Sequence, residues 1–394
     1  MLRESGDLYG LKQARYGHHW VNKIIIRKEL NMVKPSLRYK KMVAIVLFAF
    51  YLGCIAMVAQ NNPRTYVAPK TVDTISVDGF MTEPAWQNTQ WSQPYIDIEG
   101  VKIPSYETRM KMMWDDDNLY IYAELEEPHV WGTLKQKDTV IFYNNDFEIF
   151  IDPDGDTHNY YELEINALNT IWDLYLPKPY RNGAHVLDNW DIKGLQSAVQ
   201  IKGTLNNPKD IDDGWSLEIA IPWSFTKGPT SKAIVPKNEF WRMNFSRVNW
   251  DFDLIDGRYS RKKDSNGNHL PEYNWVWSPQ GVINMHEPEH WGYVYFSTDT
   301  EGVDTVFEIP QDEHIKWYLY ELYRDYRGEG NRKGIWKKNK SEFKTLPRLI
   351  LGKSISPRLE TNSFGFTLWT ISPFTGDTLI IHHDGKFERI SKGE

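Results

Sequence analysis

The sequence predicts an all-β fold in which short antiparallel strands form a sandwich or a jelly-roll barrel. The clearest observation is the alternation of apolar and polar residues in 146–152 and 161–167, on either side of the polar turn at 154–156. Alternation around an Asp/Gly turn is typical of a hairpin that buries only one of its faces. A second observation is that similar short strands and polar turns recur over residues 71–297. Both patterns disfavour a metabolic enzyme of the α/β type.

The other elements of this domain follow in order along the chain. We expect an extended linker at 61–70, where Pro63 and Pro69 stand, and a helical turn that begins at 83–86. The remaining predicted strands are 74–77, 109–114, 119–126, 198–204, 215–221, 240–248 and 292–297. Residues 71–297 are therefore predicted to form one β-sandwich domain.

The pattern changes from Thr298 onward. Apolar residues recur every three or four positions over 311–327, which predicts an amphipathic helix. A basic loop follows at 332–344, and strands are predicted at 364–371 and 378–382. Residues 298–394 are thus expected to be a small α+β appendage at the C-terminus.

The first 60 residues are predicted to be a basic leader with a signal peptide. Residues 1–41 hold ten Lys/Arg and three Asp/Glu, and an uncharged apolar run follows at 43–59. This run is at the lower limit of the length that spans a bilayer, so an uncleaved anchor is the alternative. Cys54 allows a further alternative, a lipidated leader. The start at Met1 is long for such a leader, and Met32 or Met42 would be a more usual one. The protein is accordingly expected to be exported, to the periplasm, the cell surface or the medium.

Composition narrows the function further. Cys54 is the only cysteine, so a cleaved protein has no disulfide, thiolate metal site or cysteine nucleophile. Without residues 1–41 the chain keeps 36 of its 46 basic and 50 of its 53 acidic side chains, a net charge of −14. Such a surface repels phosphate backbones, which argues against a nucleic-acid partner. Membrane contact is expected only through an uncleaved or lipidated leader.

Six segments in one order resemble the family 9 carbohydrate-binding modules and related exported bacterial proteins of polysaccharide utilisation. They are ISVDGFMTEPAW at 75–86, WDDDNLYIY at 114–122, NDFEIFIDP at 145–153, GWSLEIAIPW at 214–223, WRMNFSR at 241–247, and WSP at 277–279 with HWGY at 290–293. The resemblance implies an antiparallel jelly-roll β-sandwich that binds a polysaccharide or oligosaccharide, with structural calcium in some members. It also implies partnership with glycoside hydrolases, which here would be encoded separately.

The residues agree with this ligand class. Sugars present C–H faces and hydroxyl groups, so a binding site needs flat aromatic rings beside carboxylates, amides or guanidinium groups. In the resembling family two aromatic rings hold a terminal sugar, with a Glu, an Arg and amides around it. The candidate carbohydrate-binding residues in this chain are Trp131, Phe142, Tyr143, Glu148, Asn166, Trp172, Trp190, Arg242, Asn249 and Trp250.

Structural interpretations stand beside these candidates. Trp86, Trp114, Trp215, Trp223 and Trp241 lie in the structural motifs and are expected in the core. One row of charged residues is predicted across neighbouring strands: Glu148, Glu164, Glu218 and Arg242. The alternative to a sugar site is that this row is a half-exposed ladder of ion pairs.

The sequence also leaves three other functions open: calcium binding, glycoside hydrolysis and haem binding. Asp152, Asp154 and Asp156 alternate along a turn and offer the hard oxygen ligands that calcium prefers, although the loop is not an EF-hand. A glycoside hydrolase is the alternative to a binding protein, because two facing carboxylates would suffice. Haem binding through Met110, Met112 or Met113 with His129 is a remote alternative. The main hypothesis is therefore non-catalytic carbohydrate binding that supports carbohydrate breakdown. This function requires no cofactor.

Overall fold

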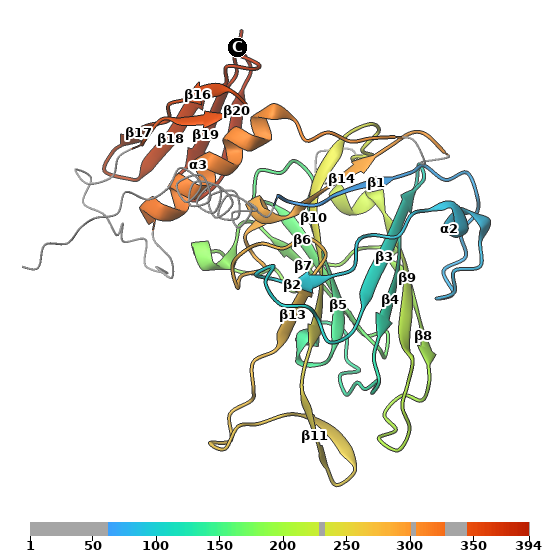
Figure 1. Ribbon diagram of the computed structural model, residues 1–394. Helices are drawn as coiled ribbons and strands as arrows, with labels where there is room; N and C mark the ends of the chain where they lie inside the picture. The colour runs from blue at the N-terminus through green and yellow to red at the C-terminus, as the bar shows by residue number, and fades with distance from the viewer. Residues whose placement is uncertain (1–61, 228–232, 301–304, 328–344, 394) are drawn as a thin grey trace, which may run out of the picture. The chain divides into compact units, whose positions relative to one another are not determined.

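The computed structural model describes residues 62–227, 233–300, 305–327 and 345–393 (Figure 1). The description below concerns the unit that begins at residue 61. The predicted leader, with its apolar run and Cys54, lies outside the described residues. Within them, no helix is long and apolar enough to cross a membrane.

Two sheets form a β-sandwich. The larger has eight strands, in the order β1-β14-β10-β5-β6-β7, and β13 pairs with both β10 and β2. Its strands are β1 (Thr65–Ala68), β2 (Ile96–Asp97), β5 (Asp146–Asp152), β6 (Tyr160–Asn166), β7 (Ile171–Leu176), β10 (Phe240–Asn249), β13 (Tyr273–Val276) and β14 (Gly292–Phe296). The smaller sheet has the order β3-β4-β9-β8, from β3 (Thr108–Trp114), β4 (Asn118–Glu126), β8 (Gln196–Lys202) and β9 (Gly214–Pro222). The pairs are antiparallel except β1 with β14, which is parallel.

The hydrophobic core lies between these sheets because each strand turns alternate side chains inward. Phe147, Ile149 and Ile151 of β5 join the same buried cluster as Leu217 and Ile219 of β9. The five tryptophans expected in the core are all buried, with exposed fractions of 0–2%. The all-β fold and the antiparallel sandwich predicted from the sequence are therefore confirmed.

The outer face of the smaller sheet is covered by the segment that precedes it. Trp86, on helix α2 (Pro84–Asn88), packs there against Tyr122 and donates from Nε1 to Glu218 of β9 at 2.8 Å. The other oxygen of Glu218 accepts the N–H groups of Asp78 and Gly79 at 3.0 and 3.1 Å. Gly79 has φ +86°, which a side chain would strain. Glu218 therefore anchors this turn to the sheet.

The C-terminal part contains one long helix and a second sheet. Helix α3 (Gln311–Arg327) has the predicted bounds and packs its apolar side against the sheet β17-β18-β19-β20. The strands of this sheet are β17 (Arg358–Thr361), β18 (Phe366–Ile371), β19 (Thr378–His382) and β20 (Phe387–Ile390), and a separate hairpin of β15 (Arg348–Ile350) and β16 (Lys353–Ile355) precedes them. Another separate hairpin, β11 (Phe252–Ile255) with β12 (Arg258–Arg261), lies between β10 and β13 of the sandwich. The basic loop predicted at 332–344 lies outside the described residues.

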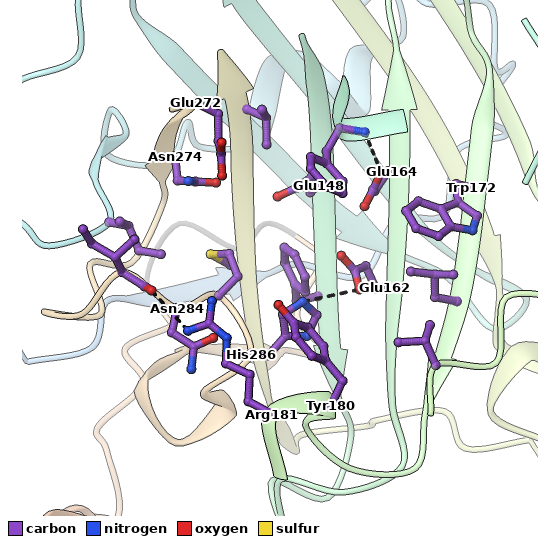
Figure 2. A pocket seen from close by; sticks show the side chains of 18 of the residues that line it. Glu148, Glu162, Glu164, Trp172, Tyr180, Arg181, Glu272, Asn274, Asn284 and His286 are labelled. Carbon is purple, nitrogen blue, oxygen red and sulfur yellow. Dashed lines mark hydrogen bonds and ion pairs between the residues drawn. The ribbon is translucent and has the colours of Figure 1, made fainter. Parts of the chain in front are cut away.

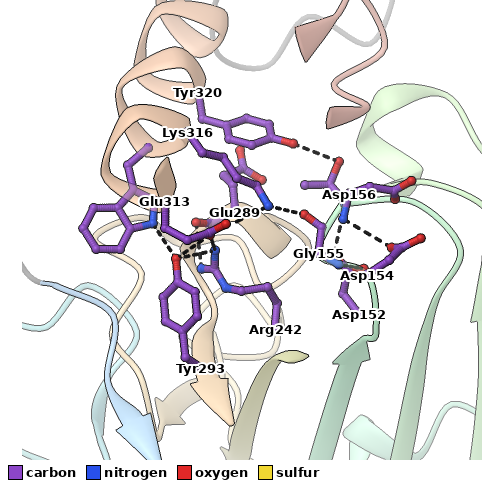
Figure 3. A network of polar contacts seen from close by, with 12 residues as sticks. Asp152, Asp154, Gly155, Asp156, Arg242, Glu289, Tyr293, Glu313, Lys316 and Tyr320 are labelled. Atoms are coloured by element: carbon purple, nitrogen blue, oxygen red, sulfur yellow. Dashed lines mark hydrogen bonds and ion pairs between the residues drawn. The ribbon is translucent and has the colours of Figure 1, made fainter. Parts of the chain in front are cut away.

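A buried polar network joins α3 to the end of β10 (Figure 3). Arg242, which is 1% exposed, donates to Tyr293 Oη at 3.0 Å and to Glu313 at 3.4 Å. It also donates to the carbonyl oxygens of Glu289 at 3.0 Å, Gly292 at 3.3 Å and Trp291. Burial alone would raise the pKa of Glu313, but the positive charges of Lys316 and Arg242 hold that pKa below its usual value.

Some elements differ from the sequence prediction. The segment expected to be a linker contains β1, whose Tyr66 and Ala68 are buried against the core. Strands β7 and β13 were not predicted, because Asp173 and Asn274 interrupt the apolar pattern that marks a strand.

The expectation that the central hairpin buries one face only is wrong. Every residue of β5 is buried, including Asp146, Glu148 and Asp152 on the face turned away from the core. This outer face is covered by segments that come later in the chain, such as the loop with Met285 and His286. Alternation fixes which residues share a face of a strand, but it does not show whether a distant segment covers that face.

Candidate functional site

A cavity of about 370 Å³ opens on the outer face of the eight-stranded sheet, opposite the core (Figure 2). Its floor is formed by side chains of β5, β6 and β7, and β10 and β13 extend it sideways. We call this cavity the outer pocket. Nineteen residues line it: Ile98, Phe142, Glu148, Phe150, Glu162, Glu164, Trp172, Leu174, Tyr180, Arg181, Val186, Asp188, Val248, Glu272, Asn274, Ile283, Asn284, Met285 and His286.

Carboxylates dominate the floor of the outer pocket. Glu148 of β5 stands directly opposite Glu164 of β6, and Glu162 lies two residues before Glu164 on the same strand. All three are at most 5% exposed. Burial, with Glu272 nearby, raises the pKa of Glu148 to about 7. Burial and neighbouring carboxylates also raise the pKa values of Glu162 and Glu164 well above the usual range.

Aromatic rings stand beside these carboxylates. Trp172 of β7 is the neighbour of Glu164 across the β6–β7 pair, and its half-buried ring lines the pocket. Its indole Nε1 is buried and donates no hydrogen bond within the described part of the chain. Phe142, on the short helix η1 (Ile141–Tyr143), is fixed because its backbone N–H donates to Glu164 at 2.9 Å. The pocket therefore offers two flat apolar surfaces next to acceptor groups.

The rim carries the remaining polar groups, which Figure 2 shows around the opening. Arg181 is exposed on the short helix η2 (Tyr180–Asn182), and Asn274 of β13 also lines the pocket. His286 is packed against the ring of Tyr180, and its Nδ1 lies 2.8 Å from Tyr160 Oη. Burial, with Arg181 nearby, lowers the pKa of His286 to about 3, so this imidazole is neutral at pH 7.

Three of the predicted carbohydrate-binding residues line the outer pocket: Phe142, Glu148 and Trp172. Trp250 does not line the pocket but holds Phe142 in place, because its Nε1 donates to the carbonyl oxygen of Phe142 at 2.7 Å. Tyr143 is 44% exposed, and Arg261 stacks on its ring and on that of Trp250.

The other predicted residues lie outside the lining of this pocket. Trp131 is 2% exposed and stacks on Tyr259, and Trp190 packs on Tyr161 at the edge of the core. Asn166 caps its own turn by accepting the N–H groups of residues 168 and 170. Asn249 accepts a hydrogen bond from Arg247 at 2.9 Å. Arg242 lies in the network with α3 described above.

The alternative of an exposed ion-pair ladder is wrong. Glu148 and Glu164 do face each other across two strands, but Glu218 belongs to the other sheet and Arg242 contacts Glu313. Local alternation in the sequence could not show that these strands lie in different sheets. The haem alternative has no support in the described residues, because Met110 and Met112 are inside the core whereas His129 contacts Tyr259.

Two lysines contact the turn predicted to bind calcium, and Figure 3 shows one of them, Lys316. Asp152, Asp154 and Asp156 have oxygens within 4.8 Å of one another, which is a spacing that one ion could bridge. Lys386, however, lies 3.2 Å from Asp156, and Lys316 donates to the carbonyl oxygen of Gly155. Asp152 also accepts the N–H groups of Gly155 and Thr157 at 3.0 and 2.9 Å. These residues fit ammonium groups better than a metal ion, and calcium at this turn stays a prediction.

Sequence reasoning did not single out Glu162, Tyr180, Arg181, Glu272, Asn274 or His286 as pocket residues. For Glu162 a signal existed, because it shares the outward positions of β6 with Glu164. The others come from the short helix η2, from loops and from β13, whose positions over the sheet depend on tertiary packing.

The fold and the pocket together define a class: a β-sandwich with a cavity, lined by aromatic and acidic side chains, on the outer face of one sheet. Comparison with protein families identifies the family to which this sandwich belongs. Residues 77–275 match the model of the family described as "Carbohydrate family 9 binding domain-like". This match covers half of the chain, and the protein therefore belongs to that family. The resemblance predicted from the sequence is thus confirmed.

Similar solved structures are distant. Two are a family 9 carbohydrate-binding module from Caldicellulosiruptor kristjanssonii, in complex with cellotriose (TM-score 0.38) and with glucose (TM-score 0.39). Each is 16% identical, and the match covers 62% of this chain and 100% of that one. A third is a candidate carbohydrate-binding protein from Bacteroides uniformis, 16% identical with TM-score 0.44, over 59% of this chain and 99% of that one. No curated protein matches the chain.

Proposed function

We propose that this protein binds a polysaccharide or oligosaccharide in the outer pocket without cleaving it. The observation that carries this proposal is the combination of Phe142 and Trp172 with the carboxylates of Glu148 and Glu164 in one cavity. Aromatic rings bind the C–H faces of a sugar, and carboxylates accept hydrogen bonds from its hydroxyl groups. A volume of about 370 Å³ accommodates the end of a glycan chain rather than a long segment of it. Membership of the family supports the same ligand class.

The proposal extends to the biological role. The basic and apolar pattern of residues 1–60 supports export to the periplasm, the cell surface or the medium. An exported binder without hydrolytic activity would hold glycans for separately encoded glycoside hydrolases and so support carbohydrate breakdown.

A hydrolase acting on O-glycosyl bonds is the second candidate, and one observation favours it. Glu148 and Glu164 face each other, and burial raises the pKa values of both. A carboxyl group that stays protonated near neutral pH is what a general acid requires. The two functions differ in whether the bound glycan is cut.

A glycan-array screen of the full chain, with a reducing-end assay on the same samples, separates these functions. Saturable binding without release of reducing ends supports the binding function. Release that disappears in both Glu148→Gln and Glu164→Gln would establish the hydrolase instead. No saturable binding to any glycan would refute both.

A further inference from the structure

One side of the outer pocket is built by two short segments outside its sheet floor, residues 180–182 and 283–287, which we call the rim segments. Six of the nineteen lining residues belong to them: Tyr180, Arg181, Ile283, Asn284, Met285 and His286. Figure 2 shows four of these, Tyr180, Arg181, Asn284 and His286, on the same side of the floor. The two segments touch each other, because the ring of His286 packs on Tyr180 and Arg181 donates to the carbonyl oxygen of Ile283 at 3.5 Å.

Contacts within the sandwich fix only part of the rim segments. Trp291 donates from Nε1 to the carbonyl oxygen of Met285 at 2.8 Å, and Gln280 donates to that of Asn284 at 2.5 Å, so the backbone of this loop is held there. Helix η2 is a single turn of three residues, and such a short turn is not stable by itself. The position of η2 and the side chain of Asn284 therefore depend on further contacts.

The last turn of α3 holds the first rim segment. Arg327 donates to Oδ1 of Asn182, the last residue of η2, and to Tyr323 Oη at 2.6 Å. The other end of the Asn182 amide donates from Nδ2 to the carbonyl oxygen of Asp384 at 3.2 Å, in the turn between β19 and β20. Both ends of this amide therefore bind the C-terminal part of the chain.

Arg324, three residues earlier on α3, holds the second rim segment. Its guanidinium lies 3.5 Å from Glu287 and donates from Nε to Glu289 at 2.6 Å. Glu287 accepts from Nδ2 of Asn284 at 2.7 Å, which fixes the amide of this lining residue. The other end of that amide, Oδ1 of Asn284, is buried and has no hydrogen-bond partner within the described residues. It is therefore available to accept a hydrogen bond from a ligand.

These anchoring residues lie beyond the part of the chain that matches the family, residues 77–275. The matched part contains the pocket floor and η2. The loop at 283–287 and helix α3 follow it in the chain. The pocket of this protein is therefore completed by residues outside the family domain.

We propose that Arg324 and Arg327 are positioning residues of the outer pocket, and that the C-terminal part sets the glycan affinity of the sandwich through them. This inference rests on the proposed function, because the rim affects affinity only if the pocket binds a glycan. Neither arginine lines the pocket, so both act through the residues that they hold. A rim that is already in place does not have to be ordered when a glycan binds, and this raises the affinity. Asn284 then presents Oδ1 as an acceptor for a glycan hydroxyl.

The test is a calorimetric titration of the full chain with cellotriose. If the wild type does not bind cellotriose, the tightest-binding oligosaccharide of the glycan array takes its place. We expect the double variant Arg324→Gln/Arg327→Gln to bind about tenfold more weakly than the wild type. Arg348→Gln is the matched control and should bind normally, since Arg348 pairs with Glu321 of α3 at 2.7 Å, away from the rim segments. Wild-type affinity in the double variant, or an equal loss in the control, would overturn the proposal.

Hydrogen exchange without sugar shows whether the arginines position the rim or only hold α3 on the sandwich. We expect faster amide exchange at 180–183 and 283–287 in the double variant, with unchanged rates at 315–323 of α3. Unchanged rates in the rim segments would overturn the proposal. Faster exchange throughout α3 would also overturn it, because the loss of affinity would then come from unfolding of the helix.

A mutant cycle tests the contact between Arg327 and Asn182 from both ends. Asn182→Ala should weaken glycan binding at least as much as Arg327→Gln does, and adding Arg327→Gln to it should cause no further loss, because the same contact is already gone. Arg327→Lys, which keeps a donor for Asn182, should restore most of the affinity. Additive losses in the cycle would contradict the positioning role.

The outcomes also separate this inference from the proposed function. A wild type that binds no glycan would refute the proposed function itself. Saturable binding by the wild type that all these variants retain would overturn the role of the arginines and leave the sugar site intact.

Discussion

Arg242 was predicted from the sequence to contact sugar, whereas the structure places it in the network with α3, and the two roles predict different outcomes for Arg242→Met. The guanidinium is 1% exposed and serves three carbonyl oxygens, Tyr293 Oη and Glu313. Methionine keeps much of the aliphatic contact but none of these hydrogen bonds. Glu313 would keep Lys316 at 3.8 Å and the hydroxyl of Tyr293 at 2.7 Å.

The magnitude follows from burial. Removing one partner of a buried ion pair costs about 3–5 kcal/mol, because the remaining charge and carbonyl groups are left unpaired. We therefore expect Arg242→Met to lower the free energy of unfolding in urea by about 3 kcal/mol or more. Arg109→Met is the matched control: Arg109 is 39% exposed and pairs with Glu124 at 2.8 Å, so its loss should cost less than about 1 kcal/mol.

Glycan affinity separates the structural role from the sugar contact. Below the denaturation range, folded Arg242→Met should bind glycan with the affinity of the wild type. An Arg242→Met variant as stable as the wild type would refute the structural role. Normal stability together with lost glycan affinity would show instead that Arg242 contacts the sugar.

Three further predictions concern other parts of the chain. Trp172→Ala should weaken glycan binding at least tenfold, about 1.4 kcal/mol, in calorimetric titrations where Trp369→Ala has no effect; equal losses would disprove a role for the pocket. Glu218→Ala should lower the free energy of unfolding by about 3 kcal/mol, since it leaves two buried donors and one partly buried donor without an acceptor, and an unchanged urea midpoint would contradict its anchoring role. Burial lowers the pKa of His286 to about 3 in the folded state, so the unfolded state binds a proton at higher pH than the folded state does. The contribution of His286 to the free energy of unfolding is therefore complete above pH 6.5 and is lost as the pH falls toward 3. At pH 5 the loss relative to pH 7.5 should be about 2 kcal/mol greater in the wild type than in His286→Gln, and parallel pH curves would refute this.

Much of the fold follows from local sequence patterns. The central hairpin, helix α3 and strand β19 are found where alternation or helical spacing predicts them, because these patterns depend on neighbouring residues. Strand β1 was missed because its extended residues form a strand only through parallel pairing with β14, more than 220 positions away.

The site was predictable only in part, for a related physical reason. Phe142, Glu148 and Trp172 come from η1, β5 and β7, which lie close together in the sequence and all contact or pair with β6, so that their side chains line one cavity. Arg242 occupies an outward position of β10, but α3 covers that end of the strand. Which carboxylates gain a lysine, such as Asp156, and which do not, such as Asp146, depends on packing between distant segments.

The central claim is that the outer pocket binds carbohydrate, and a crystal structure of the full chain with an oligosaccharide from the array screen tests it most directly. The account predicts a sugar ring against Trp172 and Phe142, with hydroxyl groups toward Glu148 and Glu164. An oligosaccharide bound elsewhere on the molecule, with the outer pocket holding only water, would contradict it.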